Sequence, residues 1–323
     1  MSIVERSPFN ARVTGIVVLA IAAALVVPFF VSQSNLYLFT LAFLYGIAAL
    51  GVIIPIGYSG QVIIAQGAFL GIGAYTYVKL SAAGVPTWGA VVAGTVLATA
   101  VAWGLGRSGI RAEGIYLGIL TIVFNELFTA LLSLFPHFLG GSTGFPAPPL
   151  YLPSFLTSAG MRSETYYWLA VGAYLCALVI TLRMLSSETG WAFLSVKDDP
   201  LAARSVGIDT KRYRLRAFAY TGALCGFAGT IFAPVVGYIS PGSFNLSATV
   251  DILLAGVIGG VMSPIATILG SFVVVFLPQV LRAFSDLRLM IYMILLVLIF
   301  IFLPQGISGL VSTYLPGIRR WLR

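Results

Sequence analysis

The stretch LYLFTLAFLYGIAALGVIIPI, residues 36–56, carries no charge and decides the class of fold. It lies inside a longer run, residues 13–78, in which 66 consecutive positions contain no Asp, Glu, Lys or Arg. As a single helix this run would be about 99 Å long, whereas the hydrocarbon core of a bilayer is about 30 Å thick. The run therefore predicts roughly three membrane crossings and excludes a soluble enzyme.

The composition of the whole chain supports the same conclusion. Hydrophobic residues make up 59% of the 323 positions and charged residues only 9%, against roughly 25% charged residues in soluble domains. Ten apolar stretches are expected to be helices, at 13–31, 36–56, 61–81, 87–106, 114–135, 166–185, 216–236, 248–262, 264–281 and 289–304. Ser263-Pro264 separates two of them, which form either two crossings or one re-entrant pair. We predict an all-α, polytopic transmembrane helical bundle of about 8–10 spans.

Basic residues orient this bundle. Residues 183–216 carry seven Lys or Arg and four Asp or Glu, so the positive-inside rule places this loop in the cytoplasm. Counting spans outward from it puts both termini inside. The rule also accounts for the net charge of +8 without a nucleic-acid partner. The expected organisation is a cytoplasmic N-terminus (1–12), one membrane domain (13–310) with loops at about 136–165 outside and 186–215 inside, and a basic cytoplasmic C-terminus (311–323).

The loop at 136–165 combines Gly140-Gly141-Ser142-Thr143-Gly144 with prolines at 146, 148, 149 and 153. This composition excludes a continuous helix, and the loop has no alternating strand pattern. A docking or gating surface on the outside and an ordinary connector are both compatible with it.

The cytoplasmic loop contains the signals of a short helix. Asp198-Asp199-Pro200 is a helix start, because an acid caps free N–H groups and Pro at the first position loses no hydrogen bond. Gly207 is the expected C-terminal cap. A short capped helix between two spans suits a groove on another protein, and the alternative is a solvated helix without a partner.

These residues resemble a known family. Leu201-Ala202-Ala203, followed after three residues by Gly207, is similar to the "EAA…G" coupling loop of ABC-importer permeases, with Leu where many have Glu. That departure is usual in the branched-chain amino acid (leucine/isoleucine/valine) importer branch. The similarity extends over about residues 36–310 and includes Gly57–Gln61, Gly67–Tyr75, Gly114-Ile115-Tyr116 with Thr121 and Glu126, Asp199–Ala219, and Gly237–Phe244. Gly259–Pro264 departs from the family pattern, which more often has Gly before the Pro.

The resemblance implies partners and a role for the coupling loop. Such a permease works with a second, homologous permease, two ATP-binding subunits and an extracytoplasmic solute-binding protein in the bacterial inner membrane. It implies that the ATPase-coupling residues are Asp199, Leu201, Ala202, Ala203 and Gly207. The chain has no G-x-x-x-x-G-K-[ST] phosphate loop, so we expect ATP and Mg²⁺ to bind the partner subunits and no cofactor to bind this chain. Gly104–Gly109 matches G-x-G-x-x-G but closes a membrane span, and we interpret it as a chance match.

Four polar residues are candidates for the translocation path. Glu126 lies near the middle of its span, where a charged group is costly. It lines the route or, together with neighbouring Asn125, forms a hydrogen bond between helices. Gln61 and Gln66 face a polar cavity or are buried amides, and the sequence leaves this open.

The remaining residues point to packing rather than chemistry. Gly67 and Gly71 form a G-x-x-x-G and, with Gly73, predict close helix contacts. Lys79 and Asp251 are expected to snorkel towards the interface. Two cysteines and one histidine give no basis for a disulfide framework or a metal site, and no catalytic constellation is present. An ion-coupled secondary transporter and an ABC permease for urea or amides are the alternative functions.

Overall fold

The computed structural model describes residues 32–109, 114–150, 162–281, 290–295, 298, 306–307 and 309. Across these ranges the chain is helical almost throughout, and six described segments are long and apolar enough to cross a membrane. The predicted all-α polytopic bundle is confirmed. The stretch at 13–31 lies outside the described residues, and the stretch at 289–304 is described only at 290–295 and 298.

The described elements follow one another along the chain as helices and two short strands. They are α2 (Gln33–Ile53), η1 (Ile54–Tyr58), α3 (Gln66–Ala82), α4 (Thr87–Gly109), α5 (Ile115–Leu134), α6 (Pro136–Leu139), η2 (Gly141–Thr143), β1 (Phe145–Pro146), α7 (Arg162–Leu185), α8 (Glu188–Asp198), α9 (Pro200–Ser205), α10 (Thr210–Val236), β2 (Tyr238–Ile239), η3 (Pro241–Phe244), α11 (Leu246–Gly259), η4 (Pro264–Ala266) and α12 (Thr267–Val280).

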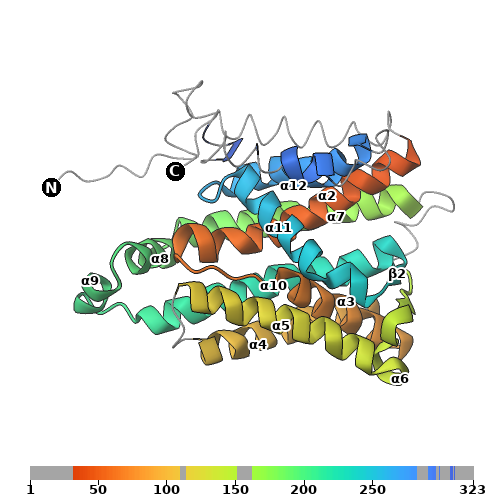
Figure 1. Ribbon diagram of the computed structural model, residues 1–323, viewed down its shortest axis with the longest axis horizontal. Coiled ribbons are helices and arrows are strands. Elements are labelled where there is room, and N and C mark those ends of the chain that lie inside the picture. The colour runs from red at the N-terminus through yellow and green to blue at the C-terminus, as the bar shows by residue number, and fades with distance from the viewer. Residues whose placement is uncertain are drawn as a thin grey trace.

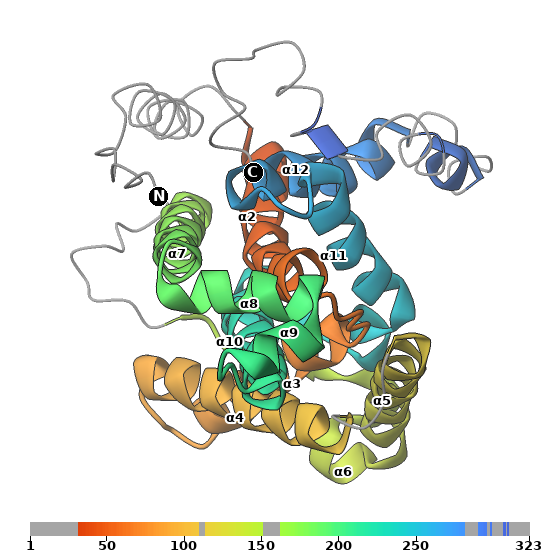
Figure 2. The ribbon, with the colours of Figure 1, turned by 90° about the vertical axis from the view of Figure 1, so that its left-hand side faces the viewer.

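Helix α3 lies at the centre of the bundle. Every residue from Gln66 to Tyr75 is buried, and α2 and α10 are also mostly buried. Helices α4, α5 and α7 surround this centre (Figure 2), and most of their residues are not buried. Their exposed apolar side chains suit a surface that faces lipid or another membrane protein.

The connections alternate between the two ends of the bundle. Helices α8 and α9 lie at one end in Figure 1, and α6 and β2 lie at the other. Strand β1 pairs with β2 in antiparallel fashion, so the two predicted extracytoplasmic loops are joined. This alternation agrees with the predicted alternation of the loops, and which end is cytoplasmic stays a prediction. The two termini, predicted to be cytoplasmic, lie outside the described residues.

One of the predicted helix boundaries that differ from the structure marks an unwound segment. The stretch at 61–81 was expected to be helical throughout, but α3 begins only at Gln66 and residues 59–65 are unwound. Pro55 has no N–H, and the helix widens into a π-helical turn in which the Ser59 N–H donates to the Ile54 carbonyl at 2.9 Å. Gly60 then adopts a φ of +66°, which ends the helix. Hydrophobicity alone did not distinguish this unwound segment from a helix.

The two apolar stretches around Ser263-Pro264 form two helices joined by a turn; Pro241–Gly259 is long enough to span a membrane, whereas Pro264–Val280 is shorter. Helix α11 leads from β2 to the turn at 260–263, where the Tyr58 hydroxyl at the end of η1 donates to the Met262 carbonyl at 2.9 Å. Helix α12 runs back along α2, and the Phe39 ring contacts the Phe276 ring with centroids 5.0 Å apart. The bounds are shorter than predicted, because residues 260–266 form a turn and a 3₁₀ segment.

Candidate translocation and coupling site

The cytoplasmic loop folds into two helices, of which the sequence predicted only the second. The Asp199 carboxylate accepts hydrogen bonds from the N–H groups of Leu201 and Ala202 at 2.8 and 3.1 Å, and Pro200 is the first residue of α9. At the other end Gly207 has a φ of +86°, and the Ile208 N–H donates to the Ala203 carbonyl at 3.0 Å. This is the Schellman arrangement, so the predicted start and cap of the helix are confirmed.

Helix α9 lies beyond the end of the bundle, and it exposes apolar side chains there. Leu201 and Val206 are each 75% exposed, and Ala202 is exposed as well, whereas Ala203 is buried. Figure 1 shows α9 at the far end of the molecule, past α8. Exposed apolar residues on a rigidly capped helix are typical of a contact surface.

The unwound segment enters the bundle, and side chains of other helices accept from the N–H groups at its end and in the first turn of α3. Thr121 Oγ1 on α5 accepts from the Ile64 N–H at 2.9 Å. Asn125 Oδ1, one turn further along α5, accepts from the Ala68 N–H at 2.8 Å. Thr249 Oγ1 on α11 accepts from the Gly67 N–H at 3.0 Å. A helix that begins inside a membrane protein needs such partners, because lipid provides none.

Asn125 links these contacts into one network. The Thr249 hydroxyl donates to Asn125 Oδ1 at 2.9 Å, and the Asn125 amide donates to the Phe244 carbonyl at 3.5 Å. The side chain is fully buried between α3, α5 and α11. The prediction of Asn125 as a path residue is untested, and its contacts place it between helices.

Both glutamines are buried. Gln61 Nε2 donates to Ser59 Oγ within the unwound segment. Gln66 Nε2 donates to the Ile63 carbonyl at 2.7 Å, whereas Gln66 Oε1 has no partner among the described residues. Neither amide lines a described cavity, so their role in the path remains a prediction.

Glu126 faces away from the network. It is exposed on the outer side of α5, and its carboxylate makes no hydrogen bond or ion pair with any described residue. The exposed residues on this side form a stripe along the helix: Ile119, Val123, Glu126, Leu127 and Ala130. Val62 of the unwound segment is also exposed, 42% of it, and lies near Gly118 on α5. A carboxylate within an apolar stripe suits a protein contact or an aqueous route better than lipid.

The glycines allow close approach, but not all to the same partner. A Cβ on Gly73 would lie 2.1 Å from the Gly226 carbonyl oxygen of α10, so two helix backbones touch there. On Gly67 it would lie 2.5 Å from Thr249 Oγ1, and on Gly71 2.5 Å from the Phe128 ring. The G-x-x-x-G pair therefore accommodates the side chains of α11 and α5.

Lys79 and Asp251 have protein partners. The Lys79 ammonium lies 3.9 Å from the centre of the Phe145 ring. The Tyr292 hydroxyl donates to Asp251 Oδ1 at 2.9 Å, so Asp251 has a protein partner, and its expected place at the interface stays a prediction. Among the described residues, no three His, Cys, Asp or Glu side chains form a group that could hold a metal ion.

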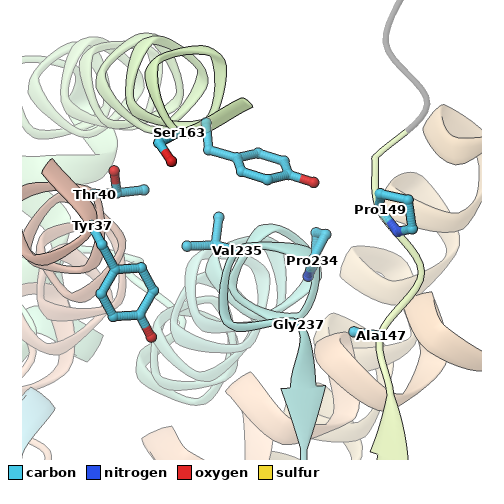
Figure 3. Close-up of a pocket in the computed structure, with 9 residues that line it drawn as sticks. Tyr37, Thr40, Ala147, Pro149, Ser163, Pro234, Val235 and Gly237 are labelled. Carbon is cyan, nitrogen blue, oxygen red and sulfur yellow. The ribbon is translucent and has the colours of Figure 1, made fainter. Parts of the chain in front are cut away.

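A cavity of about 420 Å³ lies at the end predicted to be extracytoplasmic, between the start of α2, the start of α7 and the end of α10. Figure 3 shows Tyr37 and Thr40 on one side, Ser163 above, and Pro149 and Ala147 of the outer loop on the other. The described residues that line it contribute hydroxyl and apolar groups. The cavity lies beside the paired outer loops.

Sequence reasoning missed three residues that hold this site together: Thr121 and Thr249 of the network, and Lys197 at the end of α8, whose ammonium donates to the Gly57 carbonyl at 2.7 Å. Threonine in a membrane helix usually bonds to its own helix, as Thr121 also does, and this hides its second role. Thr121 stood within a family motif, and this was its only signal. Lys197 was counted only as one positive charge.

A model of the family described as "Branched-chain amino acid transport system / permease component" matches residues 34–303. The chain belongs to this family. It is therefore a multi-pass transmembrane permease subunit, and the match favours neither an ion-coupled secondary transporter nor a urea or amide permease. The site described above accordingly belongs to a transport subunit.

Named relatives agree with the family. The chain is 31% identical over 302 residues to the high-affinity branched-chain amino acid transport system permease protein LivM of Escherichia coli K12, covering 87% of this chain and 71% of that protein. LivM of Salmonella typhimurium is 30% identical over the same shares. The autoinducer 2 import system permease protein LsrC of Yersinia enterocolitica is 28% identical over 118 residues, 34% of this chain and 33% of that protein. No solved structure matches the chain.

Proposed function

We propose that this chain moves leucine, isoleucine, valine or related amino acids across the bacterial inner membrane by alternating access. The named relatives that match most of the chain support the substrate class. In this proposal ATP and Mg²⁺ bind two partner subunits, and this chain has no enzymatic activity of its own. A second, homologous permease and an extracytoplasmic solute-binding protein complete the importer.

The observation that carries the proposal is α9. It is capped at both ends, lies beyond the bundle and exposes Leu201 and Val206. These are the properties of a helix that fits a groove on an ATP-binding subunit. Closure of those subunits on ATP would push α9 and shift the equilibrium between inward-open and outward-open states.

The stripe on α5 is the proposed contact with the second permease. Its exposed apolar residues would be buried there, and Glu126 would face the route between the two permeases. On the outside, the solute-binding protein would dock on loops 136–165 and 237–247, where β1 and β2 hold part of both loops together.

The experiment is ATP-driven uptake of labelled leucine, isoleucine and valine by the complete complex in liposomes. Leu201→Asp places a charge on the exposed face of α9, and Gly207→Val strains a residue at φ +86°. We expect both to lower uptake to near background while the protein still inserts in the membrane. Ser186→Asp, a charge in the same loop outside α9, is the matched control. Uptake at the wild-type level by both α9 variants would refute the coupling role, and a wild-type complex that takes up none of the three would refute the substrate class.

A further inference from the structure

Three segments far apart in the sequence meet at the cytoplasmic end of the bundle. They are the end of η1, the turn at 260–263 and the last turn of α8. A Cβ on Gly57 would lie 2.1 Å from the Val261 carbonyl oxygen, so η1 and the turn pack backbone against backbone. The Tyr58 hydroxyl donates to the Met262 carbonyl at 2.9 Å and joins the same two segments.

Lys197 connects α8 to this junction. Its ammonium donates to the Gly57 carbonyl at 2.7 Å and lies 3.9 Å from Met262 Sδ. Its stem covers Gly60, where a Cβ would lie 3.2 Å from Lys197 Cγ. A positive charge near the last carbonyl groups of a helical segment is stabilised, because the negative ends of their dipoles point out of the helix towards it. Lys197 therefore holds the unwound segment at its cytoplasmic end.

The other end of the unwound segment is held by α5 and α11. Thr121 accepts from Ile64, and Asn125 and Thr249 accept from the first N–H groups of α3. Residues 59–65 lack the internal ladder of a helix, so they move at lower cost than a helix would. If α8 moves relative to α5 and α11, the backbone of residues 59–65 therefore changes conformation, because its two ends are held by helices that move apart or together.

Helix α8 can transmit such a displacement because it is packed rather than loose. A Cβ on Gly190 would lie 2.0 Å from the Leu185 carbonyl oxygen, so the turn from α7 is tight. The Phe193 ring is fully buried and contacts the Tyr213 ring of α10 with centroids 5.6 Å apart. Only one residue, Asp199, separates α8 from α9.

We infer that Lys197 is a positioning residue that ties the cytoplasmic helix pair α8–α9 to the unwound segment 59–65, so that closure of the ATP-binding subunits drives movement of that segment. This inference rests on the proposed function. It assigns the transmission to a particular contact, the Lys197 ammonium on the Gly57 carbonyl, in addition to the docking surface on α9.

The test measures amino acid transported per ATP hydrolysed by the complete complex in liposomes. Lys197→Met keeps the length of the side chain and removes the donor. We expect ATP hydrolysis to continue and the transport ratio to fall about tenfold, as for loss of a hydrogen bond to a charged group. Lys197→Arg keeps a charged donor and should restore most of the ratio. Lys211→Met removes a charge from the exposed start of α10 and is the matched control.

A chemical rescue separates transmission from folding. In a Cys176→Ser background, where the remaining Cys225 is buried, Lys197→Cys is purified in the complex and then modified with aminoethyl methanethiosulfonate. Recovery of the transport ratio after modification supports the inference, because the fold is the same before and after. An unchanged ratio in Lys197→Met, or no recovery in the modified cysteine variant, would overturn it. If the wild-type complex shows no ATP-driven uptake, the proposed function is overturned, and this inference falls with it.

Discussion

Asn125 and Glu126 are neighbours in the sequence, but on α5 one is buried and the other is exposed. Asn125 is fully buried and accepts from the Ala68 N–H and the Thr249 hydroxyl. Glu126 is exposed on the apolar stripe. The sequence identified both as polar residues in mid-span and could not assign them different environments, because the rotation of α5 in the bundle depends on its packing partners.

Replacing Asn125 with Leu should destabilise the protein. The Ala68 N–H and the Thr249 hydroxyl lose their acceptor in a buried site, and each unsatisfied group costs about 1–3 kcal/mol. We expect a lower melting temperature of the purified protein in detergent. Glu126→Gln is the control and should leave the melting temperature unchanged, since its side chain has no partner among the described residues. Equal stability of the two variants would show that the network does not support α3.

Among the elements, α3 and α10 are packed with their backbones in contact. Gly73 lies against Gly226, and a Cβ on Gly229 of α10 would lie 1.9 Å from the Leu70 carbonyl oxygen. Without side chains between them, the helices gain many van der Waals contacts, which is the main source of helix association in lipid. The sequence predicted tight packing of α3, but it could not identify α10 as the helix that Gly73 touches.

Gly73→Ala should therefore be costly, although alanine is a better helix former than glycine. The added methyl group would overlap the Gly226 carbonyl, and overpacking of this kind costs about 1–3 kcal/mol. Gly104→Ala in α4 adds the same atoms where nothing lies within 4 Å, and it should be neutral or stabilise by up to about 1 kcal/mol. Thermal unfolding of both variants in detergent compares them directly. A Gly73→Ala protein as stable as Gly104→Ala would contradict the observed contact.

For the whole molecule, the two ends differ in chemistry. The end with α8 and α9 carries the basic loop, with Lys197, Arg204 and Lys211. The opposite end carries the cavity, whose described lining residues are uncharged, and the β1–β2 pair. This asymmetry predicts that the end with α8 and α9 is cytoplasmic, because basic residues are retained on that side.

Thiol labelling in whole cells measures this orientation. In a Cys176→Ser background, Ala83→Cys lies in the turn between α3 and α4, and Ser205→Cys lies in α9; both positions are exposed. An impermeant maleimide should label position 83 in intact cells and position 205 only after permeabilisation. The reverse pattern would invert the topology and place α9 out of reach of ATP-binding subunits.

The sequence by itself determined the membrane class, most of the spans, their alternation and the capped helix α9. These features depend on local chemistry: apolar length against bilayer thickness, charge on connecting loops, and side chains that bond to their own backbone. The family resemblance, carried by motifs along most of the chain, was confirmed by the match over residues 34–303.

Only the tertiary structure showed that the break between the predicted helices 36–56 and 61–81 extends to residue 65. It also showed which groups form hydrogen bonds with the backbone at this break. Residues 59–65 are as apolar as a helix, and they remain unwound because Thr121 and Asn125 of α5, Thr249 of α11 and Lys197 of α8 satisfy the backbone around them. These partners are between 57 and 182 residues away in the chain. No local pattern encodes such contacts, because they exist only when packing brings the helices together.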